Sequence, residues 1–197
     1  LSSSSAASDV YKRQMLVLGA AIGAAIGGML GPTQKSSGPR LSDLKVAAAE
    51  YGAPIPLIYG HPRVAGTIIW ASAKRELAST ESQGKGGGGA EYTSYTYEID
   101  LLILLSDNEI AGVRRIWSNG KLVWSMADES DAETIEASED TTTWRALRFH
   151  GGADDQMPDP TYEAAVGAGN APAYIGRGTL MLEGVNLGSS GQLPNLT

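Results

Sequence analysis

The most regular alternation of apolar and polar residues lies between residues 95 and 105, and it predicts a β-strand. The alternate positions hold aromatic or branched side chains that would line one face: Tyr95, Tyr97, Ile99, Leu101, Ile103 and Leu105. The opposite face is polar at Thr96, Glu98 and Asp100 and becomes apolar at Leu102 and Leu104. We therefore expect this strand to run from a half-exposed sheet edge into the core.

A β-hairpin is predicted over residues 116–124, where two short apolar runs flank Asn119 and Gly120. Asn and Gly both tolerate the positive φ angles of a type I′ turn, which joins adjacent antiparallel strands. Such a turn sets Trp117 opposite Leu122.

Four other stretches rich in β-branched or aromatic residues are expected to form strands: residues 55–60, 63–70, 143–150 and 174–182. Pro54 and Pro56 lack backbone donors, so the first of these should be an edge strand or the start of a strand. A turn at His61 and Pro62 would join it to the second.

One short helix is expected at about residues 160–166. Asp159 can cap its N-terminus, Pro160 suits its first position, and Gly167 or Gly169 can close it. Together these elements predict a mainly β domain of the α+β class, barrel-like or sandwich-like, over residues 41–197.

Residues 15–30 carry no charge and are expected to form an apolar Gly/Ala-rich helix, ending at Gly31 and Pro32. Its length of about 24 Å falls short of the roughly 30 Å hydrocarbon core of a bilayer. Gly19, Gly23 and Gly27 form a small-residue stripe that allows helices to approach closely. The helix could be buried or packed in an oligomer, could insert into a membrane, or could be the apolar region of a secretion signal. Residues 32–40 are expected to be a polar linker.

The two ends of the chain have an unusual composition. Residues 1–14 have no apolar period and resemble a translated sequencing adapter, so we expect a non-native leader before Met15. Residues 191–197 look like the beginning of a strand, so we expect the native protein to continue beyond Thr197.

Composition excludes some classes of function. The formal net charge of −7 would repel a phosphate backbone, which argues against nucleic acid as a partner. The absence of cysteine excludes disulfides, thiolate metal sites and cysteine nucleophiles. The 25 glycines and the single Phe indicate many turns and a modest core.

Two loops resemble binding motifs only in part. Gly84, Gly86 and Gly89 fit G-x-G-x-x-G, but no strand leads into the run and no helix follows it, so we interpret residues 81–90 as a loop. Residues 128–140 align with a calcium loop, yet its fifth and sixth positions hold Ala132 and Glu133 instead of an oxygen ligand and glycine. We interpret this stretch as a solvated acidic loop.

Catalytic candidates are few. His61 and His150 are the two histidines, and neither has a second histidine at helical spacing. A carboxylate pair for glycoside hydrolysis could come from one acidic cluster: Asp154, Asp155, Asp159 and Glu163. The cap role explains Asp159, and a loop explains Asp154 and Asp155. The sequence therefore predicts no catalytic residue, no metal site and no cofactor.

Three groups of segments together resemble a known family. The first comprises residues 37–46 (SGPRLSDLKV), 51–60 (YGAPIPLIYG) and 63–66 (RVAG). The second is residues 110–122 (IAGVRRIWSNGKL), and the third comprises residues 152–160 (GADDQMPDP), 167–174 (GAGNAPAY) and 193–195 (LPN). In this order they are similar to the start of the tail hub or baseplate proteins of long-tailed phages, prophages and gene transfer agents.

The resemblance implies a β-rich hub at the distal end of a phage tail, usually a homotrimer. It implies the distal tail protein and the tape-measure protein as partners, a possible contact with the host envelope, and a location in the virion after assembly in the host cytoplasm. The matching segments contain no reactive constellation, so the resemblance transfers no catalytic residue.

Two other classes of function stay open at this point. Tail tips often carry cell-wall hydrolases or their accessory modules, which would need a convergent carboxylate pair in a cleft. A bacterial surface domain anchored by residues 15–30 would need a basic cytoplasmic flank, which Lys12 and Arg13 supply only if the leader is native.

Overall fold

A computed structural model describes residues 35–41, 54–83, 90–126 and 142–197. The chain divides into two compact units, which are described separately. Of the described residues, 35–39, 78–83 and 90–94 belong to the first unit, and the others belong to the second. Strands β3 (Arg75–Gln83) and β4 (Ala90–Ser106) contribute residues to both.

The first unit is a polar β-ribbon. Strand β1 (Lys35–Ser37) runs parallel to β4, with Lys35 opposite Glu91, and β3 also pairs with β4. Thr80 and Thr93 join their hydroxyls across the ribbon at 3.0 Å, and Lys35 forms an ion pair with Glu91 at 3.3 Å. Residues 35–37 were expected in a linker and residues 81–83 in a loop. Both segments are polar on both faces, so they show no alternation that would reveal a strand.

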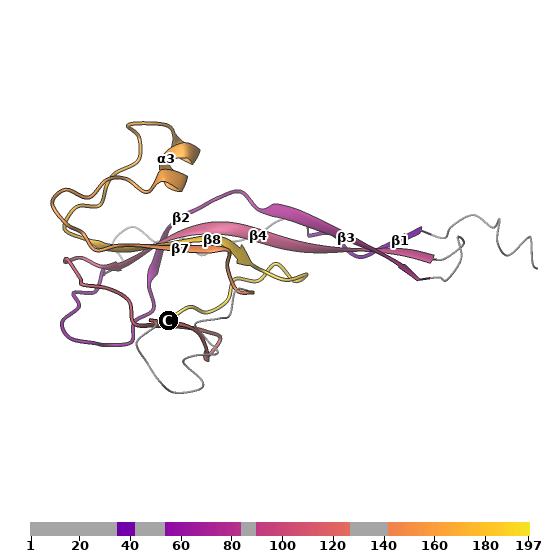
Figure 1. The fold of residues 1–197 in the computed structure, drawn as a ribbon, viewed down its shortest axis with the longest axis horizontal. Helices are drawn as coiled ribbons and strands as arrows, with labels where there is room; N and C mark the ends of the chain where they lie inside the picture. Colours follow the sequence, from indigo (N-terminus) through magenta and orange to yellow (C-terminus); the bar gives the residue numbers. More distant parts are fainter. Residues whose placement is uncertain (1–34, 42–53, 84–89, 127–141) are drawn as a thin grey trace, which may run out of the picture. The chain divides into compact units, whose positions relative to one another are not determined.

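The second unit is built around an antiparallel sheet (Figure 1). Strand β4 lies between β2 (Thr67–Ala71) and β8 (Gly178–Asn186), and β7 (Ala146–His150) pairs with the other side of β8. A separate hairpin consists of β5 (Arg115–Ser118) and β6 (Lys121–Ser125). The mainly β prediction is confirmed. The described strands form an open, sandwich-like arrangement and not a closed barrel.

The sheet face toward the hairpin, here called the hairpin face, carries the main apolar core. The alternate residues of β4 lie there, and Tyr97, Ile99 and Leu101 have no exposed surface. They pack with residues of the hairpin and of β8: Ile116, Val123, Leu180, Leu182 and Val185. The alternation predicted for β4 is therefore confirmed.

The hairpin has the predicted turn. Asn119 and Gly120 adopt φ angles of 52° and 85°, and Trp117 is paired with Leu122. Thr197 adds to the edge of β5 through two backbone hydrogen bonds with Trp117, at 2.8 and 3.0 Å. The positive φ angles match the type I′ geometry that twists in the same sense as the two strands.

The opposite sheet face, here called the helix face, lies beneath helix α3 (Pro160–Val166) in Figure 1. The strand register places Trp70, Leu102, Met181 and Arg148 on this face. Helix α3 has no buried residue, and Tyr162 on it packs against Trp70 with 5.2 Å between ring centroids. The predicted cap, start and end of the helix at Asp159, Pro160 and Gly167 are confirmed.

Several predicted strand boundaries were wrong. Residues 55–60 form no strand, because the prolines remove donors and the segment bonds instead to residues 106–108. The strands predicted at residues 63–70, 143–150 and 174–182 begin at Thr67, Ala146 and Gly178. The helix predicted over residues 15–31 and the acidic loop lie outside the described residues. Among the residues that are described, no helix is long and apolar enough to cross a membrane.

Candidate functional site

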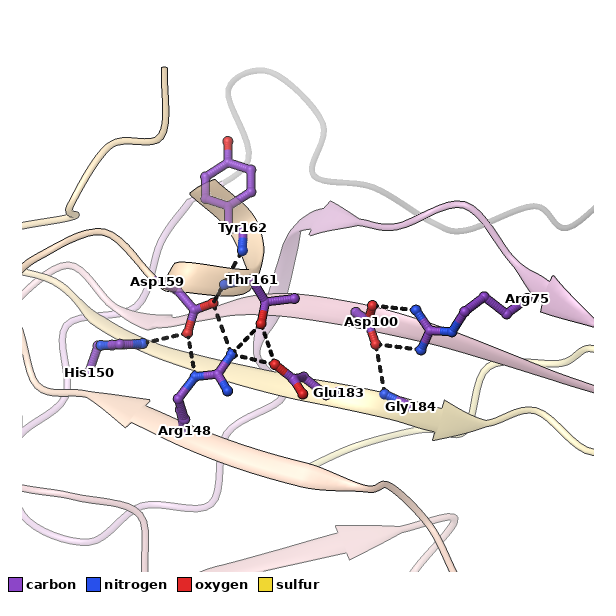
Figure 2. A network of polar contacts seen from close by, with 9 residues as sticks. All are labelled: Arg75, Asp100, Arg148, His150, Asp159, Thr161, Tyr162, Glu183 and Gly184. Carbon is purple, nitrogen blue, oxygen red and sulfur yellow. Dashed lines mark hydrogen bonds and ion pairs between the residues drawn. The ribbon is translucent and has the colours of Figure 1, made fainter. Parts of the chain in front are cut away.

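A network of charged side chains lies on the helix face, around the buried carboxylate of Asp159 (Figure 2). Its side chain is only 2% exposed. The backbone N–H groups of Thr161 and Tyr162 donate to Asp159 Oδ1 at 2.9 and 3.2 Å, which caps α3. Arg148 Nε and His150 Nε2 each lie 2.9 Å from Asp159 Oδ2. One carboxylate thus both starts the helix and ties it to β7.

Arg148 extends this network to β8. Its Nη2 donates to Glu183 Oε1 at 2.6 Å and to Thr161 Oγ1 at 2.7 Å. Thr161 Oγ1 also donates to Glu183 Oε1. The guanidinium therefore bridges two carboxylates that come from the helix cap and from the neighbouring strand. We call Arg148, His150, Asp159, Thr161 and Glu183 the helix anchor.

A second charged group joins β3 and β4. The carboxylate of Asp100 accepts two hydrogen bonds from the Arg75 guanidinium, at 2.6 and 2.7 Å, and a third from Gly184 N–H at 2.8 Å. Gly184 has a φ of 63° and lies at a register shift of β8 opposite β4. At this irregularity one backbone N–H points toward the buried carboxylate of Asp100. The carboxylate thereby gains a hydrogen-bond partner that it would otherwise lack.

The two groups hold their carboxylates in the ionised form. Burial disfavours the charged Asp159 carboxylate, but hydrogen bonds from Arg148, His150 and Tyr162 N–H outweigh it and lower its pKa. The Arg75 hydrogen bonds lower the pKa of Asp100, and those from Thr161 and Arg148 lower the pKa of Glu183. Hydrogen bonding to Asp159 raises the pKa of Arg148.

This arrangement does not suit acid–base chemistry. A glycosidase needs one carboxyl group with a raised pKa that can donate a proton, and a second one facing the substrate. Asp159 and Glu183 instead share one guanidinium, and both have lowered pKa values. Within the described part of the chain, no three His, Asp or Glu side chains are grouped so as to hold a metal ion. The geometry suits a structural network.

The acidic residues and the histidines that were considered as catalytic candidates lie in different parts of the structure. Asp159 lies in the helix anchor, whereas Asp154 and Asp155 are exposed in a turn before it. His150 contacts Asp159, and His61 lies in an exposed bend. The glycine stripe of Gly19, Gly23 and Gly27, the glycine-rich run and the acidic loop lie outside the described residues.

Five network residues were not predicted: Arg75, Asp100, Arg148, Thr161 and Glu183. Two of them share a recognisable signal, since each is a lone charge within an otherwise apolar strand: Arg148 in β7 and Glu183 in β8. A charge in such a place is expected to have a partner, because an unpaired buried charge is costly. The sequence does not say which partner it is.

A second candidate site consists of four loops that meet at one end of the sheet, where β4 and β7 end and β8 begins. We call residues 54–60, 106–110, 151–157 and 173–177 the end surface. Pro56 accepts a hydrogen bond from Asp107 N–H at 3.0 Å, and Ile110 N–H donates to Gly151 at 3.0 Å. Gly176 N–H donates to Gly152 at 2.7 Å. Backbone hydrogen bonds thus join all four loops.

Comparisons with known proteins gave one finding. No protein-family model matches the chain, and no curated protein matches it. Among solved structures, it is similar to a chain from the virion of a native gene transfer agent (GTA) particle, at 25% identity and a TM-score of 0.47. The match covers 92% of this chain and 37% of the solved one, so the chain spans little more than a third of that length.

Proposed function

We propose that this chain is a structural component of a phage-type tail tip, where it acts by assembling with copies of itself and with neighbouring tail proteins. In this proposal it functions as a homotrimeric hub in the virion, contacts the distal tail protein and the tape-measure protein, and takes part in host attachment and DNA delivery. Assembly takes place in the host cytoplasm. The role is structural and not catalytic.

The observation that carries the proposal is the meeting of the segments that resemble tail hub proteins. Residues 54–60 bond to residues 106–108, which directly precede the second segment. Ile110, the first residue of that segment, bonds to Gly151 beside the third. Segments far apart in the sequence therefore share one end of the sheet. The proposal agrees with the likeness to a virion component but does not depend on it.

The geometry of the charged groups favours this role over that of a cell-wall hydrolase. The carboxylates of Asp100, Asp159 and Glu183 all accept hydrogen bonds from arginine and have lowered pKa values. They join strands to one another and to the helix, so they are engaged in holding the fold together and do not face a substrate.

The first test is the mass of the full chain by light scattering after size exclusion, alone and mixed with purified distal tail and tape-measure proteins. We expect a stable trimer or a complex of defined stoichiometry. A monomer that binds neither protein and hydrolyses peptidoglycan would overturn the proposal.

Gly23→Leu tests the role proposed for the glycine stripe: if helices of neighbouring copies pack along Gly19, Gly23 and Gly27, this variant should lose the trimer.

A further inference from the structure

The end surface exposes five large apolar side chains, three on its first loop and one each on its third and fourth loops. Ile55, on the first loop, is 38% exposed. Leu57 is 60% exposed and Tyr59 is 81% exposed, both in the first loop. Met157 is 76% exposed in the third loop and Ile175 is 51% exposed in the fourth. Large apolar side chains gathered on neighbouring loops are typical of interaction surfaces.

The first loop is held in a fixed shape beneath its exposed side chains. Ile58 N–H donates to Ser106 Oγ at 3.1 Å and to Asn108 Oδ1 at 3.0 Å, and Asn108 Nδ2 donates back to Ile58 at 3.1 Å. Leu57 and Tyr59 flank this fixed residue, and the side chains of both are exposed. A loop that is already ordered loses less entropy when a partner binds.

The third and fourth loops are fixed in a similar way. Gln156 accepts from Gly152 N–H at 2.7 Å and donates to Ala173 at 2.5 Å. Gly152 has a φ of 99°, and a side chain there would meet the Arg177 backbone at 2.6 Å. Tyr174 has a positive φ of 54°, which is unusual for a bulky residue and leaves the neighbouring Ile175 at the tip of a turn. A conformation of this kind persists where surrounding contacts fix it, so these two loops also have a defined shape.

The charges on the end surface indicate the charge that a binding partner should carry. Its loops carry four carboxylates, on Asp107, Glu109, Asp154 and Asp155, and one guanidinium, on Arg177. Arg177 pairs with Asp107 at 2.5 Å, which leaves three exposed carboxylates without a cation among the described residues. The next cation along the first loop, Arg63, is engaged elsewhere: it stacks on Trp117 at 4.3 Å and bonds to Thr197.

We propose that the end surface docks a different protein, whose contact surface combines apolar side chains with lysine or arginine. This proposal rests on the assembly role proposed above and adds the chemistry of one partner. A second copy of the chain is a poor occupant, because its net charge is −7 and it would bring further negative charge to an acidic surface. An anionic lipid surface is disfavoured for the same reason.

Three matched peptides test the proposal on the full chain by fluorescence anisotropy. The first is an amphipathic helix of leucine and lysine, the second replaces lysine by glutamate, and the third replaces leucine by serine. We expect saturable binding of the leucine–lysine peptide alone.

Two double variants test which side chains bind this peptide. Leu57→Ser combined with Tyr59→Ser should weaken its binding by about tenfold or more, as for truncated interface hot spots. Asp154→Asn combined with Asp155→Asn should make it less sensitive to salt.

The matched control is Leu77→Ser, since Leu77 is 46% exposed but lies in β3, away from the four loops. It should leave peptide binding unchanged, and an unchanged melting temperature shows that each variant folds. Equal binding of the leucine–lysine peptide to wild type and to the loop variant would overturn the proposal, as would binding of the glutamate peptide. Light scattering on the same samples separates the two proposals. If the loop variant loses the oligomer, a second copy occupies the end surface, so this inference fails while the assembly role stands.

Discussion

The two faces of the central sheet are covered in different ways. On the hairpin face, β5 and β6 pack apolar side chains against alternate residues of β4, with Ile116 and Val123 both 4% exposed. On the helix face, α3 has no buried residue and is held by the helix anchor and by the contact of Tyr162 with Trp70. One layer is fixed by its apolar packing and the other mainly by directed polar contacts.

The difference matters because the two kinds of contact respond differently to change. Apolar packing is non-directional and its contribution is roughly proportional to the area removed from water, so a cavity weakens every element that packs on the same core. A buried network of charges needs every partner in place, since removal of one leaves another unpaired. We therefore expect damage to the hairpin face to affect the whole unit and damage to the helix anchor to stay local.

The largest effect is expected for Leu182→Ala, which opens a cavity in the core of the hairpin face. Leu182 has no exposed surface and lies in β8 opposite Leu101. The free energy of unfolding should fall by about 2–5 kcal/mol. Urea unfolding followed by tryptophan fluorescence measures it, with Leu182→Met as the control, which should cost less than about 1.5 kcal/mol. A loss as small as that of the control would show that this face is not the main source of stability.

The next effect is expected for Asp159→Asn, which keeps a capping oxygen but removes the charge that faces Arg148 and His150. Stability should fall by about 1.5 kcal/mol at neutral pH, the usual contribution of a hydrogen bond to a charged group. The loss should be local, with faster amide exchange at Thr161 and Tyr162 and unchanged protection in β4. Asp154→Asn is the control, because Asp154 is exposed and has no ion pair among the described residues; it should be neutral within about 0.5 kcal/mol.

The stability difference between wild type and Asp159→Asn should depend on pH. The pKa of Asp159 is lowered in the folded protein. Its contribution to stability is therefore fully present above the unfolded-state pKa, about 3.9, and is lost as the pH falls through the lower folded-state pKa. Wild type and Asp159→Asn should differ at neutral pH and converge in acid, below that window. Curves that stay parallel down to about pH 2 would show that the charge of Asp159 is not what anchors α3.

How much of this could be predicted from the sequence differs between the two faces. The core of β4 was predicted correctly, because one face of a strand repeats every second residue and needs no knowledge of a partner. Helix α3 was also predicted, since the cap and first position at Asp159 and Pro160 are local signals. The helix anchor was not, because Arg148 and Glu183 lie 35 residues apart and their pairing depends on the register of β7 with β8.

The segment at residues 55–60 shows a second reason for failure. Its apolar residues indicated a strand, but Ile55, Leu57 and Tyr59 are exposed and the backbone bonds to Ser106 and Asn108. Composition alone cannot separate an apolar strand from an apolar loop that is kept exposed. The two prolines were the informative signal, because they remove the donors that a sheet would need.

The smallest effect is expected at the hairpin turn, where sequence and structure agree most closely. Gly120 has a φ of 85°, and a side chain there would meet nothing within 4 Å, so Gly120→Ala costs only backbone strain. Stability should fall by about 1 kcal/mol. Gly112→Ala is the matched control, because Gly112 is equally open but has no positive φ, and it should be neutral or slightly stabilising. Equal effects of the two substitutions in urea unfolding would mean that the turn does not set the register of Trp117 with Leu122, and that packing of the hairpin on the sheet does.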